Sequence, residues 1–318
     1  MKKIYELAII GGGPAGITFY NRVLKGSRIN REDIILFEKG SSLCEDLTTY
    51  GRFVRNFGDL NHTKWDFIVD GKVNGNEVAK YFSDKFSGNV CHMQVTKIFK
   101  NAEDIFVLYT DEKQFLANHV VLATGVHLKS IESLAIKGKI FNITGKHDGS
   151  VFKIDFNAYE VIFVGSGDMV LFYANELARF IASSMTELRY SPITVLLKQE
   201  ISKKANPILV KDFLKYSSMG YINVVKNHWQ ITGYKTKANG RIDIITSNTG
   251  EYKTKAPGGA YLGVYVGYMA QHPDLINCRV TDLVCIGDLA CYLEGSEINI
   301  SSALLDATRK AEFFQETV

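Results

Sequence analysis

The chain has 318 residues, of which 46% are hydrophobic and 22% charged, so it is long enough for two globular domains of ordinary size. Its formal net charge of +3 is small, and Lys and Arg are spread along the sequence, which excludes a strongly basic surface for nucleic acid. Because no apolar segment approaches the ~18 residues of a membrane span, we expect a cytoplasmic protein with neither a membrane nor a nucleic-acid partner.

The first predicted strand, residues 7–10, runs directly into a glycine-rich turn with the spacing G-x-G-x-x-G, after which a helix is expected. In this motif the first glycine permits the tight turn, the second lets the backbone approach a pyrophosphate, and the third lets the helix pack against the strand. The phosphates lie at the helix N-terminus, where free N–H groups and the helix dipole stabilise negative charge. The residues predicted to bind them are Gly11, Gly13, Pro14, Ala15 and Gly16.

An acidic residue, Glu38, ends the second predicted strand, residues 34–37. A carboxylate at this distance from the glycines accepts hydrogen bonds from an adenosine ribose, and we include Lys39, which follows it, in the predicted site. The strand, the turn, the helix and the acid-ended second strand together predict a dinucleotide site rather than a plain glycine-rich turn.

Residues 41–75 lack strong periodicity and are expected to form a long, partly ordered connection, of the kind that often covers an enzyme site. Helical spacing follows at residues 76–86, and residues 90–100 and 104–110 alternate like the strands of a β-hairpin. A short buried strand at residues 119–122 then ends in a turn of small residues, where the backbone can pass close to a ligand. This turn consists of Ala123, Thr124 and Gly125.

The opening pattern recurs at residues 161–164, which lead into Gly165-x-Gly167 and a predicted helix at 169–180. The repeated βαβ plan predicts the α/β class, with two Rossmann-like dinucleotide-binding domains. The third glycine position holds Val170, where close packing favours Gly or Ala, so the second domain either binds a nucleotide or keeps the fold without it. Three lysines after its next strand suit either a 2′-phosphate, as in NADP sites, or a solvated basic turn. They are Lys198, Lys203 and Lys204.

Near the end of the sequence, a predicted strand at residues 282–286 finishes in Gly287-Asp288, and a helix is expected at about residues 300–314. Asp288 is either a helix cap or turn residue, or a carboxylate that holds a hydroxyl group of a cofactor. Its place between a buried strand and a long helix suits the second role.

With these motifs in this order and spacing, the chain resembles the low-molecular-weight thioredoxin reductase family of FAD-dependent pyridine-nucleotide oxidoreductases over nearly its whole length. The resemblance implies a discontinuous FAD-binding domain, residues 1–126 and 257–318, and an inserted NAD(P)-binding-like domain, residues 127–256. It also implies a homodimer.

The resemblance carries further FAD contacts onto this sequence, for which ordinary turn and cap chemistry is the alternative. In the family, a threonine and an asparagine lie along the flavin, and they match Thr49 and Asn56. The strand residue whose backbone meets the adenine matches Val95, and the aspartate that binds the ribityl chain matches Asp288. A helix start at the pyrimidine edge of the isoalloxazine matches Ile298, Asn299 and Ile300. Free N–H groups there stabilise the negative charge of a reduced flavin.

The sequence departs from this family at the redox-active Cys-x-x-Cys. The corresponding run, residues 144–149, contains no cysteine, and no two of the five cysteines have that spacing, so thioredoxin reduction through a dithiol is not expected. His147, within this run, is either a catalytic group that exchanges a proton beside the flavin or a turn histidine without catalytic duty. Trp65 either shields a flavin face or belongs to a packed loop, and Cys291 is either a small buried residue or a reactive thiol near the flavin.

The leading hypothesis is a FAD-dependent oxidoreductase whose flavin is reduced by NAD(P)H and passes electrons to an acceptor other than an internal disulfide, either a small molecule or a protein. Two alternatives stay open. In one, the second nucleotide site is degenerate, and ferredoxin or another protein carrier supplies the electrons. In the other, the chain is a non-catalytic FAD-binding subunit. No metal site is expected in any of the three.

Overall fold

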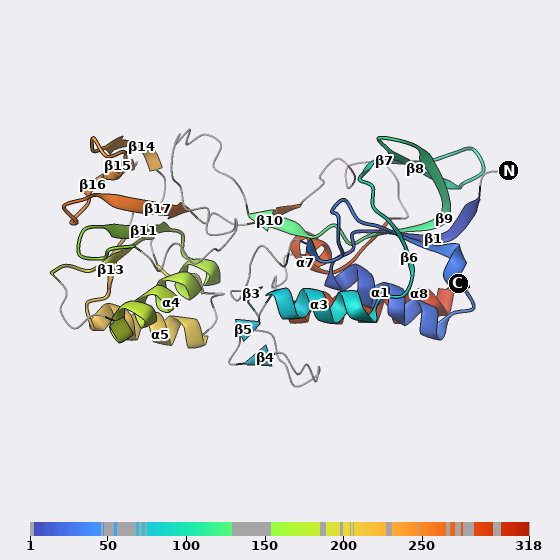
Figure 1. Ribbon diagram of the computed structural model, residues 1–318, viewed down its shortest axis with the longest axis horizontal. Helices are drawn as coiled ribbons and strands as arrows, with labels where there is room; N and C mark the ends of the chain where they lie inside the picture. The colour runs from blue at the N-terminus through green and yellow to red at the C-terminus, as the bar shows by residue number, and fades with distance from the viewer. Residues whose placement is uncertain are drawn as a thin grey trace. The chain divides into compact units, whose positions relative to one another are not determined.

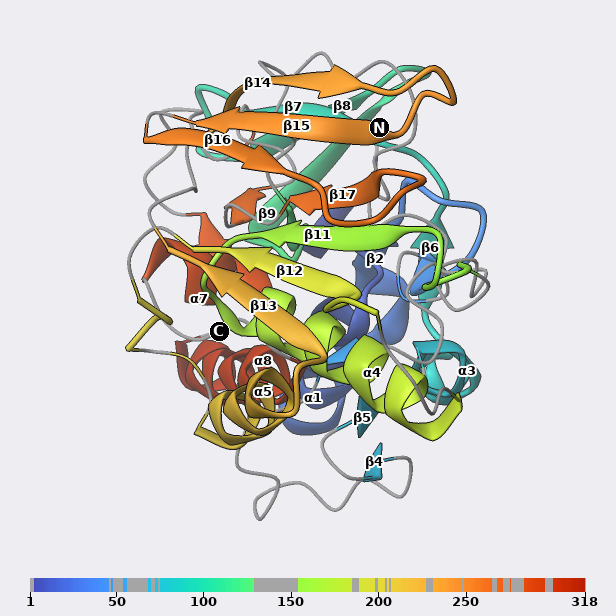
Figure 2. The ribbon, with the colours of Figure 1, turned by 90° about the vertical axis from the view of Figure 1, so that its left-hand side faces the viewer.

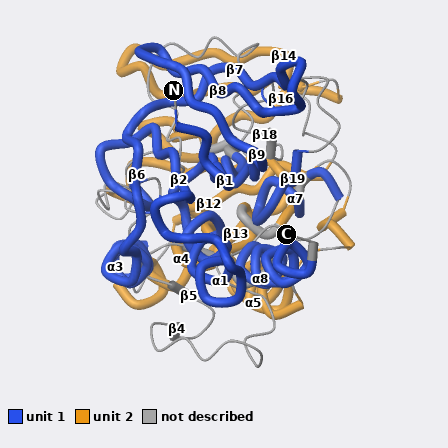
Figure 3. The backbone as a smooth tube through the Cα atoms, turned by 90° about the vertical axis from the view of Figure 1, so that its right-hand side faces the viewer, with its two compact units in different colours: residues 1–127, 268–318 blue, residues 128–267 orange. Residues whose placement is uncertain are grey.

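The computed structural model describes residues 3–45, 47, 54–55, 68–69, 72–73, 75–128, 154–184, 189–197, 200–203, 205, 207–226, 231–247, 249–264, 268–270, 275, 283–294 and 300–317. Contacts divide the chain into unit 1, residues 1–127 and 268–318, and unit 2, residues 128–267, which Figure 3 colours separately. Where the chain passes between the units, β10 (Val126–Leu128) and β18 (Tyr268–Ala270) pair with each other. Unit 1 is therefore built from both ends of the sequence.

Unit 1 contains a large sheet (Figure 1). Its described strands are β1 (Ile4–Ile10), β2 (Ile34–Phe37), β6 (Asn89–Cys91), β7 (Val95–Lys100), β8 (Phe106–Thr110), β9 (Gln114–Leu122) and β19 (Val284–Cys285). The order is β6-β2-β1-β9-β8-β7, with β19 also beside β9. β1 is parallel to β2 and β9, and β19 is parallel to β9, so the carboxyl ends of these strands meet at one edge. Open α/β sheets bind ligands at such an edge.

Among the described helices, α1 (Pro14–Gly26), α3 (Gly75–Lys85) and α8 (Ile300–Thr317) cover one face of this sheet (Figure 1). α1 begins at Pro14, and proline is favourable there because an N–H group at the first helical position would have no partner within the helix. α1 packs along α8. Leu7 and Ile9 of β1 join the core under these helices, whereas Ala8 and Ile10 join a second core on the other face. The unbroken apolar run at the end of β1 is thus explained by burial on both faces. A short helix, α7 (Asp288–Leu293), follows β19.

Unit 2 repeats this plan. Its described strands are β11 (Glu160–Val164), β12 (Ile193–Leu196), β13 (Ile222–Val225), β14 (Ile231–Thr236), β15 (Ile242–Ser247), β16 (Gly250–Lys253) and β17 (Ala260–Val264). β13, β12, β11 and β17 are parallel, and the antiparallel strands β15, β14 and β16 continue the sheet. α4 (Asp168–Ser184) and α5 (Pro207–Ser218) lie along one face (Figure 2). The prediction of an α/β fold with two Rossmann-like domains is confirmed.

Two expectations differ from the structure. Residues 90–100 form two short strands, because β6 pairs with β2 whereas β7 pairs with β8. Unit 2 extends to residue 267, past the expected boundary at 256, because β17 pairs along β11 in the second sheet.

Within residues 48–74 the structure describes only a small sheet of β3 (Val54–Arg55), β5 (Lys72–Val73) and β4 (Ile68–Val69). None of the described helices is both long and apolar enough to cross a bilayer.

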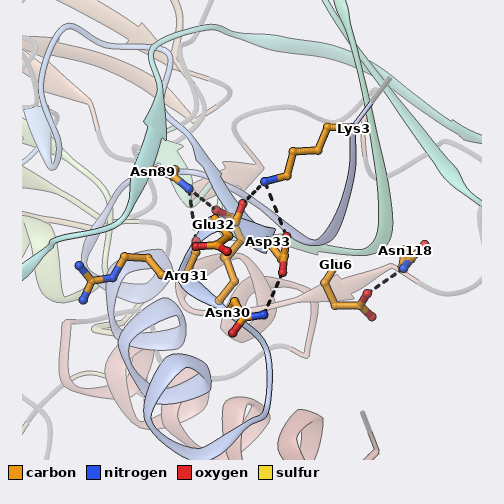
Figure 4. A network of polar contacts seen from close by, with 9 residues as sticks. Lys3, Glu6, Asn30, Arg31, Glu32, Asp33, Asn89 and Asn118 are labelled. Carbon is orange, nitrogen blue, oxygen red and sulfur yellow. Dashed lines mark hydrogen bonds and ion pairs between the residues drawn. The ribbon is translucent and has the colours of Figure 1, made fainter. Parts of the chain in front are cut away.

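A polar network lies at the amino-terminal edge of the unit 1 sheet (Figure 4). Lys3 Nζ donates to the carbonyl oxygen of Glu32 at 2.5 Å and lies 3.6 Å from Asp33 Oδ1, in the 3₁₀ helix η1 (Arg31–Asp33) that precedes β2. Asn118 donates to Glu6 Oε2 at 2.8 Å. The contacts of Lys3 link the start of β1 to the start of β2, and the bond from Asn118 to Glu6 links β9 to β1. An exposed ion pair such as Lys3–Asp33 contributes about 0–1 kcal/mol. We interpret this network as structural.

Candidate functional site

The turn between β1 and α1 is closed toward the sheet. Gly11 has φ +116°, and a Cβ atom there would lie 2.3 Å from the carbonyl oxygen of Ala123. A Cβ atom at Gly16 would lie 2.0 Å from the carbonyl oxygen of Gly11. At Gly13, by contrast, no described atom lies within 4 Å of the Cβ position, and no described side chain caps α1. The turn is therefore open at the helix N-terminus, which suits a phosphate group.

Glu38, directly after β2, lies beside this turn. Its Oε2 accepts a hydrogen bond from the Gly12 N–H at 3.0 Å, and its Oε1 accepts one from the Gly40 N–H at 2.8 Å. His92 Nδ1 forms a hydrogen bond of 2.8 Å with the carbonyl oxygen of Gly40. Each carboxylate oxygen can accept a further hydrogen bond, so Glu38 is oriented by two backbone amides and can still accept from a ribose hydroxyl. The next residue, Lys39, is exposed.

The end of β9 borders the same turn. The Ala123 N–H donates to the carbonyl oxygen of Ile10 at 2.7 Å. The hydroxyl group of Thr124 is buried and has no hydrogen-bond partner among the described atoms. A buried polar group without a partner costs about 1–3 kcal/mol, which a polar ligand would offset. Gly125 has φ +72°, and the space around its Cβ position is open.

The last part of the sequence reaches the same edge. The Ile286 N–H donates to the carbonyl oxygen of Leu122 at 2.9 Å, which places Gly287 next to the end of β9. Gly287 has φ +70°, and a Cβ atom there would lie 2.4 Å from the Cβ atom of Ala15 in the first turn of α1. Asp288 is the first residue of α7. Segments from both ends of the sequence therefore meet at the predicted dinucleotide site.

Other predicted site residues lie elsewhere or are not described. Val95 begins β7, and its side chain is buried in the core, so only its backbone is available for the predicted adenine contact. Ile300 begins α8. The residues that lie outside the described part of the chain are Thr49, Asn56, His147, Ile298 and Asn299.

Unit 2 contains a turn with equivalent backbone contacts. The Gly165 N–H donates to the carbonyl oxygen of Leu196 at 3.1 Å, as the Gly11 N–H donates to that of Phe37 at 2.8 Å. Gly165 also has a positive φ, +139°. No described atom lies within 4 Å of the Cβ position of Gly167, after which α4 begins. This turn is therefore also open at a helix N-terminus.

Two side chains distinguish the second turn from the first. Val170, at the position of Gly16, is 1% exposed, so α4 carries a buried side chain where α1 has room for none. Leu197, at the position of Glu38, is 2% exposed. Both Leu197 and Glu38 donate their N–H to the next parallel strand, which supports their equivalence. The second turn thus lacks the carboxylate that would accept a hydrogen bond from a ribose hydroxyl.

Two cysteines near the first turn have thiols that resist ionisation. Burial, and to a lesser extent the charge of Glu38, raises the pKa of Cys44 to about 12. Burial, followed by the charge of Asp288, raises the pKa of Cys291 to about 11. The Cys44 N–H also donates to the carbonyl oxygen of Gly12 at 3.0 Å. These observations favour buried structural residues over reactive thiols.

We expect Cys44 and Cys291 of the native protein to resist iodoacetamide at pH 8. With a pKa of about 11, roughly one Cys291 thiol in 1,000 is ionised at that pH, and raising the pH toward 10 should increase its labelling before that of Cys44. Peptide mass spectrometry after alkylation measures this, with urea-unfolded protein as the control in which all five cysteines react. Native labelling of Cys291 as fast as in urea would contradict the prediction.

Comparison with known proteins agrees with this arrangement. A family model described as pyridine nucleotide-disulphide oxidoreductase matches residues 5–242. The chain belongs to this family. A ferredoxin–NADP reductase of Streptococcus agalactiae is 26% identical over 199 residues, 57% of this chain and 53% of that protein, so the chain spans about half the length of this relative. A thioredoxin reductase of Listeria monocytogenes is 22% identical over 291 residues, 88% of this chain and 79% of that protein.

The fold of this chain is also seen in a solved structure. The bacillithiol disulfide reductase Bdr of Staphylococcus aureus superimposes with a TM-score of 0.73 at 16% identity, covering 100% of this chain and 99% of that one. The members of the family are oxidoreductases that act with a pyridine nucleotide, and the cofactors of the family are FAD and NAD(P)H. The glycine turn, the open start of α1 and the buried Thr124 hydroxyl fit a dinucleotide. The predicted family is confirmed by the match of its model to residues 5–242, and the predicted enzyme class and cofactors agree with those of the family.

Sequence reasoning missed three residues that shape the site. Cys44 and His92 hold the two loops that flank Glu38. Asp306 Oδ2 accepts a hydrogen bond from the Gly287 N–H at 2.8 Å. The i, i+4 spacing of Asp306 and Lys310 signals an ion pair on a helix, but no pattern in the sequence connects either residue with Gly287.

Proposed function

We propose that unit 1 binds FAD at the edge formed by β1, β9 and β19, and that the chain is a FAD-dependent oxidoreductase. The observation that carries this proposal is the convergence of the uncapped α1 N-terminus, the Glu38 carboxylate and the buried Thr124 hydroxyl at one sheet edge. The N–H groups of α1 would bind the diphosphate, Glu38 the adenosine ribose and Asp288 a ribityl hydroxyl. When bound, FAD supplies the redox chemistry, because it accepts hydride from NAD(P)H and passes the electrons onward.

For the acceptor we propose a small molecule or a protein other than an internal dithiol. No two cysteines of the sequence have the Cys-x-x-Cys spacing, and burial raises the pKa of both Cys44 and Cys291. His147 stays the predicted residue for exchanging a proton with the flavin or the acceptor. A homodimer and a cytoplasmic location also stay predictions.

For the donor we propose NADPH, bound at the turn of unit 2. Leu197 occupies the position at which a carboxylate would accept a hydrogen bond from the 2′-hydroxyl of NADH and repel the 2′-phosphate of NADPH. The Ser202 N–H donates to the carbonyl oxygen of Ser166 at 3.0 Å, which attaches the following loop to the glycine turn. That loop carries the exposed Lys203, whose charge favours a phosphate.

An anaerobic titration of the FAD-loaded protein tests the donor. NADPH is expected to bleach the visible flavin absorption at concentrations at least about tenfold below those of NADH, because a bound 2′-phosphate gains at least one charge-assisted contact. Equal efficiency of the two nucleotides would refute the choice of NADPH. A protein that takes up no FAD after incubation would refute the flavin site itself.

A second candidate function rests on Val170. Its buried side chain leaves α4 without the glycine that lets α1 lie close to its turn, which favours a degenerate nucleotide site. The electrons would then come from a protein carrier such as ferredoxin. Reduction of the bound FAD by reduced ferredoxin, with neither nucleotide effective, would establish this alternative in place of the NADPH proposal.

A further inference from the structure

Two side chains of α8 hold the backbone that leads into the proposed FAD site. Asp306 Oδ2 accepts a hydrogen bond from the Gly287 N–H at 2.8 Å, and Asp306 Oδ1 lies 3.0 Å from Lys310 Nζ. Lys310 Nζ also donates to the carbonyl oxygen of Cys285 at 3.1 Å and to Glu294 Oε1 at 3.0 Å. A carboxylate and an ammonium group on successive turns of one helix therefore bind the backbone at both ends of the connection between β19 and α7.

The connection between β19 and α7 must be restrained by contacts with other elements. Gly287 has φ +70° and lies so close to Ala15 that a Cβ atom would be 2.4 Å from the Ala15 Cβ, so glycine is required there. Glycine also has the greatest backbone freedom of all residues, and contacts from other elements must restrict it. The hydrogen bond from Asp306 is charge-assisted, and the Asp306 side chain is only 15% exposed, which makes it a strong restraint.

We propose that Asp306 and Lys310 are positioning residues of the FAD site, which fix the turn at Gly287 so that Asp288 and the N-terminus of α1 bind the same ligand. The inference rests on the proposed function. Neither side chain contacts the cofactor in this arrangement. Asp306 acts through the N–H of Gly287, and Lys310 acts through the carbonyl oxygen of Cys285 and by pairing with Asp306.

The affinity of the full-length, flavin-free protein for FAD, measured by quenching of flavin fluorescence, tests the proposal. Asp306→Asn leaves a side chain with one oxygen and one NH₂ group. If the oxygen accepts the hydrogen bond from the Gly287 N–H, the NH₂ group faces the Lys310 ammonium, which is also a donor, and the contact with Lys310 is lost. We expect the Kd for FAD to rise about tenfold or more. Glu294→Gln is the matched control, because it weakens another contact of Lys310 without touching Gly287, and its Kd should stay within about twofold of wild type.

A double variant separates positioning from a general loss of stability. Asp306→Asn combined with Lys310→Met removes the conflict between the two donors, so the amide oxygen can accept from Gly287, but it also removes the contact of Lys310 with the Cys285 carbonyl oxygen. The Kd should therefore recover in part, to about threefold above that of wild type. An unchanged Kd in Asp306→Asn, an equal rise in Glu294→Gln, or no recovery in the double variant would each overturn the proposal. Failure of the FAD site itself is distinguishable, because the wild-type protein would then bind no FAD.

Discussion

Replacing Glu38 with glutamine is expected to weaken FAD binding by about 100-fold in a protein that still folds. In the structure both carboxylate oxygens accept backbone N–H groups, one from Gly12 and one from Gly40. Glutamine offers one oxygen and one NH₂ group, so one backbone N–H would face another donor. The substitution also removes the negative charge proposed to accept hydrogen bonds from the ribose. Hydrogen bonds to charged groups are worth about 1.5–3 kcal/mol each, and the expected loss is of that size.

Fluorescence titration with FAD measures this effect, and Glu45→Gln provides the control. Glu45 is an acidic residue of the same loop, and its Oε2 accepts a hydrogen bond from the Ser41 N–H at 2.8 Å, which a glutamine oxygen can replace. We therefore expect its Kd to change less than about threefold. If Glu38→Gln binds FAD as tightly as the wild type does, the ribose is not held by this carboxylate.

Alanine at Gly13 is expected to abolish FAD binding without unfolding the protein. Gly13 has φ −78° and ψ 179°, a conformation that alanine adopts readily, and no described atom lies within 4 Å of the added Cβ. The methyl group would instead occupy the space in which the diphosphate approaches the backbone. Alanine at Gly11 differs, because φ +116° and a carbonyl oxygen at 2.3 Å add strain of about 2–4 kcal/mol to the folded state.

Thermal unfolding without FAD, combined with FAD titration, distinguishes these two variants. Gly13→Ala should unfold at the wild-type temperature, whereas Gly11→Ala should unfold at a lower one. Gly167→Ala is the matched variant in unit 2, where the Cβ position is equally open, and it should leave FAD binding intact while weakening the reduction by NADPH. Wild-type affinity for FAD in Gly13→Ala would show that the open side of the first turn is not a phosphate site.

The local parts of the site could be predicted because their determinants are contiguous in sequence. The strand, the turn and the start of α1 follow from an apolar run, three spaced glycines and a proline, each of which restricts the backbone by itself. The glycine turn of unit 2 could be predicted from the sequence for the same reason. The buried positions of Leu197 and Val170 could be seen only with the structure, since their burial depends on which strands and helices pack around them.

Contacts between distant segments could not be predicted from one sequence. The hydrogen bonds of Asp306 with Gly287 and of His92 with Gly40 depend on the paths of the intervening chain. The division of residues 90–100 between two pairings shows the same limit. Alternating residues favour a strand, but tertiary packing decides its partner, which is β2 for residues 89–91 and β8 for residues 95–100.

The discontinuity of unit 1 has a consequence for biosynthesis. α1 packs along α8, and Ala15 lies against Gly287, so unit 1 cannot assemble fully until residues near 287–317 have left the ribosome. At about 5–20 residues per second, translation leaves the first glycine turn waiting roughly 15–60 s for these partners. Unit 2, which is continuous, can fold during this interval. FAD can therefore enter the proposed site only after residues near 287–317 have been synthesised, and a chaperone can shield the apolar face of α1 until then.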